Sequence, residues 1–260
     1  MSYENIRYEV ENQVAQVTID RPKVMNALNH QTLVELAAAF DEAKADDAVR
    51  ALVLTGSGDK AFVAGADINE LAKMDPLGAK DLAYFGQTVV TRLETLGKPT
   101  VAMVNGFALG GGLELALAAN LRTASTNARV GLPEVSLGII PGYGGSQRLA
   151  RIAGPGVARE WVLTGDMFGA DEAHRVGVVN RLFAPEELRE GTMKMVNTIL
   201  KRGPVAVRLA IETIRRGMSM TQSEGELIET DMFALAATTQ DMKEGMSAFL
   251  EKRPANFKNC

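Results

Sequence analysis

The chain has 260 residues, 46% of them apolar and 23% charged, which is ample for one large α/β domain with a buried core. Its 28 Lys and Arg against 32 Asp and Glu give a net charge of −4, so the basic excess of a nucleic-acid-binding protein is absent. The only cysteine is Cys260, and His30 and His174 stand far apart without further ligands, so the sequence predicts neither a disulfide nor a metal site. The N-terminal residues resemble no leader, and no apolar run has the length of a membrane span. We therefore expect a soluble, cytoplasmic protein without membrane contact.

The first part of the chain alternates short strands, glycine-containing loops and helices, which is typical of α/β layering. Apolar residues at Leu33, Leu36, Ala37 and Phe40 follow the spacing of a half-buried helix. The predicted elements are two strands within 6–20 around the turn 11–13, a helix from about Gln31 to Asp46, a strand within 50–58, a loop running into a short helix within 62–74, a helix within 82–97 that Gly97 ends, and a strand within 98–106.

From Pro185 onward the pattern is almost entirely helical, and we predict helices within 185–202, 204–217 and 223–253. This change of pattern divides the chain into an α/β part, residues 1–195, and a helical part, residues 196–260. The many Met and Phe side chains of the last helices indicate core or subunit packing rather than a cofactor site. Neither a dinucleotide-binding nor a P-loop glycine motif fits the sequence.

The segment 105–120, NGFALGGGLELALAAN, places three glycines, Gly110–Gly112, directly before a helix-forming run. The first N–H groups of a helix have no partner within the helix and lie at the positive end of its dipole. Without side chains around them, such amides can stabilise an oxyanion. The segment VAGADI offers a second donor, because Gly65 and Ala66 follow a strand at a loop-to-helix junction.

Glu114 lies in the first turn of this helix between Leu113 and Leu115. If its side chain faces inward, burial raises its pKa toward the range that suits acid–base chemistry. The segment alone fits equally well with a carboxylate that favours the helix N-terminus and faces solvent. Glu134, which follows Pro133 in another apolar and glycine-rich segment, favours the inward orientation. Two carboxylates in one dry pocket do not both ionise easily, so one acts as acid and the other as base.

Several motifs, in order and together, resemble the enoyl-CoA hydratase (crotonase) family over essentially the whole chain. They are NALN at 26–29, FVAGADI at 62–68, VNGFALGGGLELAL at 104–117, LPEVSLGIIPGYGGSQRL at 132–149, LTGD at 163–166 and EGMSAFLEKRPANF at 244–257. The resemblance implies a crotonase-like spiral of ββα units with a C-terminal helical trimerisation region, and a homohexamer built as a dimer of trimers. It also implies an acyl-CoA thioester substrate and no separate cofactor.

The resemblance assigns the two catalytic glutamates to Glu114 and Glu134 and the oxyanion hole to the N–H groups of Ala66 and Gly111. The family members that keep both glutamates are hydratases, which indicates a hydro-lyase. We expect reversible syn addition of water to a trans-2-enoyl-CoA, in fatty acid metabolism and β-oxidation. The likeness extends to short-chain enoyl-CoA hydratases and to 3-hydroxybutyryl-CoA dehydratases, which run this reaction in reverse.

The same resemblance implies the contacts to substrate and CoA, which are Lys23, Ala64, Gly65, Asp67, Ile68, Gly110, Phe249 and Lys252. Asn69 departs from the family pattern, because a basic residue is frequent at its position, so the resemblance does not carry a phosphate contact to Asn69. Acyl chain length depends on how deeply the segment from about Leu71 to Phe85 closes the pocket. Two alternatives stay open: an enoyl-CoA isomerase, which Glu114 disfavours, and a non-catalytic RNA-binding protein, which the net charge and the glutamate pair disfavour.

Overall fold

A computed structural model describes residues 3–260, which divide by their contacts into two compact units. The first unit runs to Leu96 and continues from Thr100 to Met193, and the second comprises Gly97–Pro99 and Lys194–Cys260. Within residues 3–260, no helix is both long and apolar enough to cross a membrane.

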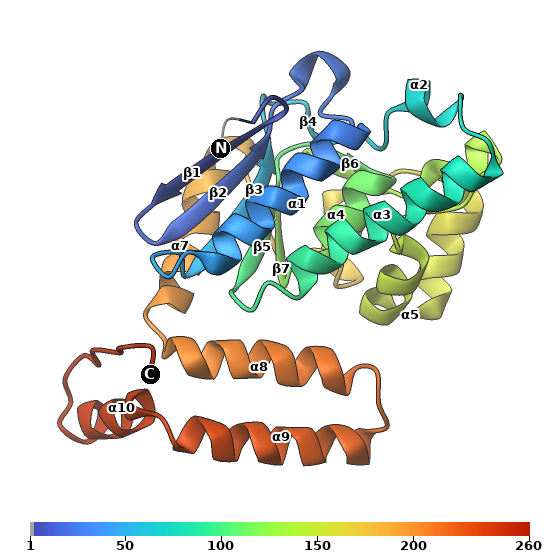
Figure 1. Ribbon diagram of the computed structural model, residues 1–260. Coiled ribbons are helices and arrows are strands. Elements are labelled where there is room, and N and C mark those ends of the chain that lie inside the picture. Colours follow the sequence, from blue (N-terminus) through green and yellow to red (C-terminus); the bar gives the residue numbers. More distant parts are fainter. Residues whose placement is uncertain (1–2) are drawn as a thin grey trace. The chain divides into compact units, whose positions relative to one another are not determined.

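The first unit contains a six-stranded sheet in the order β1-β2-β3-β5-β7-β10 (Figure 1). The hairpin of β1 and β2 is antiparallel and turns at Asn12 and Gln13, whose φ angles of 49° and 67° are left-handed. All other pairs of this sheet are parallel. Its strands are β1 (Ile6–Glu11), β2 (Val14–Ile19), β3 (Ala51–Gly56), β5 (Thr100–Val104), β7 (Leu121–Ser125) and β10 (Arg181–Phe183).

A second sheet of four short strands has the order β4-β6-β8-β9, and β8 pairs with β9 in the antiparallel sense. Its strands are β4 (Ala61–Val63), β6 (Phe107–Leu109), β8 (Arg129–Gly131) and β9 (Phe168–Gly169). We did not predict β4, because we interpreted residues 62–74 as a loop running into a short helix. The short helix itself is present as α2 (Ile68–Leu71).

Helices cover these sheets, and the side chains between the layers form the core. In α1 (His30–Ala45) the predicted stripe is buried, and Asn29 caps the helix by accepting the N–H of Thr32. Burial of each large side chain, such as Phe40, contributes about 1.5–3 kcal/mol. The other helices of this unit are α3 (Pro76–Glu94), α4 (Gly111–Ala118), α5 (Gly145–Thr164) and α6 (Ala170–Arg175), with short 3₁₀ helices at Pro22–Val24, Pro133–Leu137 and Pro185–Glu187.

Two asparagines fasten the loops that follow the parallel strands. Asn26 Nδ2 donates to the carbonyls of Ser57 and Ala61 at 3.0 and 2.8 Å. Asn105, directly after β5, donates to the carbonyls of Gly56 and Gly58 at 3.0 and 2.8 Å. These bonds hold the loop between β3 and β4, and the start of β4, at the end of the large sheet.

Helix α7 (Leu188–Leu200) runs from the first unit into the second, which continues with α8 (Pro204–Gly217), α9 (Gln222–Ala237) and α10 (Gln240–Leu250). Figure 1 shows α8 and α9 side by side as an antiparallel pair, and Gly217 and Gly225 let their backbones approach closely. The segment 223–253 is largely helical as predicted, but it forms two helices, α9 and α10. The chain breaks at Thr238 and Thr239, and the Thr239 hydroxyl caps α10 by accepting the N–H of Met242.

Candidate active site

Each glycine of the run Gly110–Gly112, at the start of α4, meets a different close neighbour. A Cβ on Gly112 would lie 2.1 Å from the carbonyl oxygen of Val63, and one on Gly110 would lie 2.9 Å from Glu134 Oε1. A Cβ on Gly111 would lie 3.0 Å from the ring of Tyr143. Gly110 also has a φ of +50°, which favours glycine. The run therefore lets α4 begin in contact with β4, with the segment of Glu134 and with Tyr143.

The N–H groups of Ala66 and Gly111 are available to a ligand. The carbonyl of Gly65 accepts the N–H of Leu28 and the N–H of Asp67 donates to the carbonyl of Leu28, both at 2.8 Å. Because successive amides of an extended chain point in opposite directions, the N–H of Ala66 points away from Leu28. Gly111 is the first residue of α4 and has no acceptor within its helix. In the described part of the chain neither N–H meets an acceptor, and both residues line a cavity of about 830 Å³.

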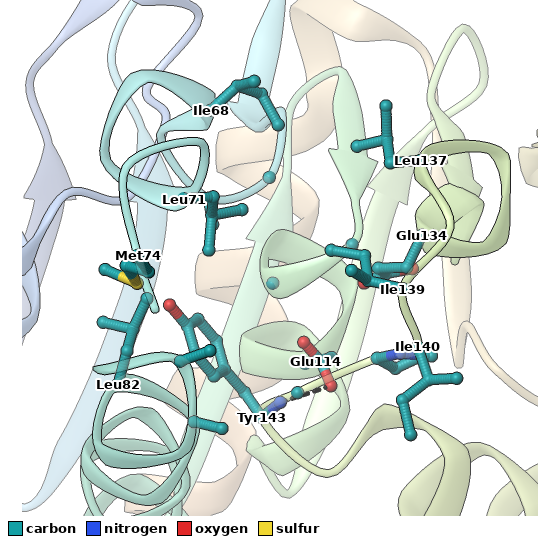
Figure 2. A pocket seen from close by; sticks show the side chains of 18 of the residues that line it. Ile68, Leu71, Met74, Leu82, Glu114, Glu134, Leu137, Ile139, Ile140 and Tyr143 are labelled. Atoms are coloured by element: carbon teal, nitrogen blue, oxygen red, sulfur yellow. Dashed lines mark hydrogen bonds between the residues drawn. The ribbon is translucent and has the colours of Figure 1, made fainter. Parts of the chain in front are cut away.

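Glu114 is buried, with 1% of its surface exposed, and it lines the same cavity. Its Oε1 accepts the N–H of Tyr143 at 2.8 Å (Figure 2) and the N–H of Gly145 at 2.7 Å. Burial raises its pKa to about 7, and the nearby Glu134 adds to this rise while the two amides oppose it. The alternative of a solvent-facing carboxylate is therefore wrong. Oε2 carries none of these bonds and stays available to a molecule in the cavity.

Glu134 reaches the cavity from the 3₁₀ helix Pro133–Leu137. Its Oε2 is buried and has no hydrogen-bond partner among residues 3–260. Burial raises the pKa of this carboxyl as well. A buried polar atom without a partner is rare in folded proteins and marks a place for a ligand, a proton or a water molecule. Two carboxyls of raised pKa thus face one cavity from separate elements, an arrangement that suits proton transfer.

Apolar side chains form much of the rest of the cavity wall, and Figure 2 shows them on two sides of the glutamates. One side carries Leu71, Met74 and Leu82, and the other carries Leu137, Ile139 and Ile140. Sequence reasoning pointed to the segment 71–85 as a wall of the pocket but missed Tyr143. The only sequence signal for Tyr143 was an aromatic residue inside the glycine-rich segment PGYGG.

Only some of the residues expected to contact CoA line the cavity. Ala64, Gly65, Ile68 and Gly110 line the cavity. Asp67 does not line it; its side chain accepts the N–H of Asn69 at the start of α2 and pairs with Arg21 at 3.3 Å. This pair, together with a hydrogen bond from Arg21 to the carbonyl of Ala27, fastens the loop of Ala66 to the loop before α1.

The three remaining CoA contacts stay predictions. Lys23 is exposed on the 3₁₀ helix Pro22–Val24 and does not line the cavity. Phe249, 82% exposed at the end of α10, and Lys252, with a φ of +56°, belong to the second unit. Within residues 3–260, no group of three or more His, Cys, Asp or Glu is arranged to hold a metal ion.

Comparison with known proteins gives the same family that the motifs indicated. The sequence profile of the family described as Enoyl-CoA hydratase/isomerase matches residues 9–260. The chain is 49% identical over 257 residues to the crotonyl-CoA hydratase of Syntrophomonas wolfei subsp. wolfei, with 99% of each chain covered. It is 45% identical over 260 residues to the short-chain-enoyl-CoA hydratase of Clostridium acetobutylicum, with 100% of each chain covered.

A solved structure supports the assignment of the fold. The crystal structure of enoyl-CoA hydratase from Bacillus anthracis matches with a TM-score of 0.96 and 36% identity, over 99% of this chain and 100% of that chain. The predicted crotonase-like fold is thereby confirmed. With a family profile and relatives that span nearly its full length, this chain belongs to the enoyl-CoA hydratase/isomerase family.

Proposed function

We propose that this chain is an enoyl-CoA hydratase, a hydro-lyase that adds water reversibly to a trans-2-enoyl-CoA. The observation that carries the proposal is the pair Glu114 and Glu134, which face one cavity with raised pKa values. The names of the relatives from S. wolfei and C. acetobutylicum support hydration of short-chain substrates.

In the proposed mechanism the thioester oxygen accepts the N–H groups of Ala66 and Gly111. These amides stabilise the negative charge that develops on this oxygen as the enolate forms. Glu114, as the carboxylate, takes a proton from water while the water oxygen attacks C3. Glu134, in its protonated form, gives a proton to C2. Exchange of one proton between the pair and solvent then restores the starting state.

The structure supports these roles through the unequal surroundings of the two carboxyls. Two N–H groups hold Glu114 Oε1, which orients Oε2 for contact with water and favours the ionised form. Burial raises the pKa of Glu134, only its own backbone N–H opposes this rise, and its Oε2 has no donor among residues 3–260, which favours the protonated form. Because both carboxyls titrate in one cavity, the resting proton is a property of the pair.

The proposal includes the way the substrate lies. Ile68 and Leu137, 52% and 58% exposed, mark the mouth of the cavity, and the CoA part, large and polar, stays there. Ala64, Gly65 and Gly110 contact the pantetheine and thioester end. No cofactor takes part in this mechanism, since the two carboxyls and two amides supply the proton transfers and the oxyanion stabilisation.

The proposal extends to fatty acid β-oxidation, a cytoplasmic location and a hexamer of two trimers. Large apolar side chains exposed on the helices of the second unit support assembly through these helices; they are Ile214, Met218, Leu227, Phe233, Met246 and Phe249. Analytical ultracentrifugation tests the hexamer, and a monomer at micromolar concentration would contradict it. Cell fractionation tests the location.

The deciding experiment follows the loss of enoyl-thioester absorbance with crotonyl-CoA for the wild type, Glu114→Ala and Glu134→Ala. We expect rapid hydration by the wild type and a loss of about 10²-fold or more in each variant. A variant with near-normal hydration removes that glutamate from the mechanism. A wild type that hydrates neither crotonyl-CoA nor longer enoyl-CoAs, yet moves the double bond of a 3-enoyl-CoA, is an isomerase instead.

A further inference from the structure

The ring of Tyr143 is wedged between two helices, and a glycine on each helix makes room for it. A Cβ on Gly86 of α3 would lie 2.2 Å from Cδ1 and 2.3 Å from Cε1 of the ring. A Cβ on Gly111 of α4 would lie 3.0 Å from Cε2 and 3.1 Å from Cδ2. The two edges of the ring therefore touch different helix backbones. With 5% of Tyr143 exposed, the ring has little freedom to swing aside.

The backbone of Tyr143 is fixed to Glu114 as well. Its N–H donates to Glu114 Oε1 at 2.8 Å, and Arg148 donates to its carbonyl at 3.0 Å. Tyr143 lines the cavity, and burial and the charges of Glu114 and Glu70, rather than a hydrogen bond, raise the pKa of its phenol. In Figure 2 the ring extends from beside Glu114 toward the wall of Leu71, Met74 and Leu82, with its hydroxyl leading.

The direction of the acyl chain follows from where the cavity is open. Its mouth lies between the exposed Ile68 and Leu137, whereas Leu82 and Tyr143 are 9% and 5% exposed. With CoA at the mouth and the thioester oxygen at Ala66 and Gly111, an acyl chain that runs inward past C3 meets the ring beside Gly111. An acyl chain that instead leaves the cavity over Ile139 and Ile140, which are 45% and 74% exposed, does not meet the Tyr143 ring.

We propose that the ring of Tyr143 closes the acyl end of the cavity and makes the site selective for short enoyl chains. This inference rests on the proposed hydratase function. The physical reason is steric. The ring occupies space next to the reacting carbons, and its contacts with Gly86 and Gly111 prevent it from making room for further methylenes. Leu71, Met74 and Leu82 then supply the side wall, while Tyr143, from a different segment, limits the length.

The test compares kcat/KM for crotonyl-CoA and trans-2-octenoyl-CoA in the wild type, Tyr143→Ala, Tyr143→Leu and Tyr143→Phe. We expect Tyr143→Ala to raise the octenoyl-to-crotonyl ratio at least about tenfold, the discrimination that one methylene gives in an apolar pocket. Tyr143→Leu should give a smaller rise, and Tyr143→Phe should keep the wild-type ratio because it keeps the ring. The ratio cancels any general loss of activity, since every variant retains the N–H that holds Glu114.

A matched control is Tyr84→Ala, the same change at an exposed position of α3 that does not line the cavity. It should leave both the rate and the ratio unchanged. A wild-type ratio in Tyr143→Ala and Tyr143→Leu would overturn the inference, and so would a shift in Tyr143→Phe as large as that in Tyr143→Ala.

A second measurement separates this inference from the proposed function. Calorimetric titration with butyryl-CoA and octanoyl-CoA reports the pocket without turnover. If the wild type hydrates nothing while Tyr143→Ala still shifts the ratio of the two Kd values toward octanoyl-CoA, the hydratase proposal fails and the inference about Tyr143 stands. If neither acyl-CoA binds to the wild type, both are wrong.

Discussion

Replacing Glu114 with glutamine should stabilise the protein at neutral and alkaline pH while removing its activity. The buried carboxylate lowers the stability of the folded state, since burial disfavours its charge and raises its pKa from 4.5 to about 7. A pKa moved by this amount corresponds to about 3 kcal/mol of stability. Glutamine has nearly the same shape and its oxygen accepts the N–H groups of Tyr143 and Gly145, but it carries no charge to bury.

The sign of the effect follows from proton binding. Between pH 4.5 and about 7 the folded protein keeps the proton of Glu114 that the unfolded chain has already released. The stability associated with the protonated carboxyl is therefore fully present below pH 4.5 and is lost as the pH rises through about 7. Glu114→Gln has no carboxyl at this position, so it does not lose this stability. The difference in free energy of unfolding between the variant and the wild type should therefore grow from pH 4.5 to about 7 and level off above it. Glu134 has a pKa raised in the same direction, and it titrates in both proteins.

The assay is urea unfolding of both proteins from pH 5 to 8.5 at one fixed protomer concentration, because association adds to apparent stability. At pH 8 we expect Glu114→Gln to be more stable by about 2–3 kcal/mol, and the difference to shrink toward pH 5. Glu186→Gln, at an exposed position, is the control and should change stability by less than about 0.5 kcal/mol. A glutamine variant no more stable than the wild type at pH 8 would refute the claim that Glu114 is a destabilising buried charge.

Three further changes test other parts of the site. Gly86→Ala places a Cβ 2.2 Å from the Tyr143 ring, so it should lower the free energy of unfolding in urea by about 1–3 kcal/mol and slow hydration. The control Gly156→Ala places its Cβ in open space and should leave the free energy of unfolding unchanged. Asn26→Gly keeps the left-handed φ of +60° but removes the side chain that donates to the carbonyls of Ser57 and Ala61. The free energy of unfolding should fall by about 2–3 kcal/mol, and a fall of less than about 0.5 kcal/mol would contradict this role. The kcat/KM for crotonyl-CoA should rise as the pH rises toward about 7, where Glu114 loses its proton, and a flat profile from pH 5 to 8 would argue against Glu114 as the base.

The candidate site could be predicted because glycine and burial leave marks in the sequence. A run of three glycines before a helix has few other uses, and the structure gives each of them a close neighbour. Glu114 stood out because a carboxylate between two leucines is unusual, and its burial is confirmed. The strands β3 and β5 were predictable for a related reason, since every residue of each is buried and their apolar runs are continuous.

The parts that the sequence missed depend on short or tertiary features. Strand β4 has three residues, too few for a period, and it exists because it pairs with β6. Helix α3 starts at Pro76, and the prediction of a helix within 82–97 did not use the local signal for this start, Asp75 as a cap before a proline. The break between α9 and α10 lies at two threonines, which are also common inside helices. Tyr143 could not be assigned, because the two glycines that flank its ring lie 57 and 32 residues earlier in the chain.

The site is held mainly by backbone groups, and this explains how a protein keeps a costly carboxylate in place. Glu114 is oriented by the N–H groups of Tyr143 and Gly145, and a Cβ on Gly145 would lie 2.7 Å from Glu114 Cγ. Backbone donors on a rigid helix start do not change charge with pH, so they orient Glu114 equally well with or without its proton. A lysine or arginine in their place would lower the pKa of Glu114 strongly and weaken it as a base. The two amides oppose the rise in the pKa of Glu114 that burial causes, but they do not cancel it. The pKa therefore stays near the pH at which a general base works best.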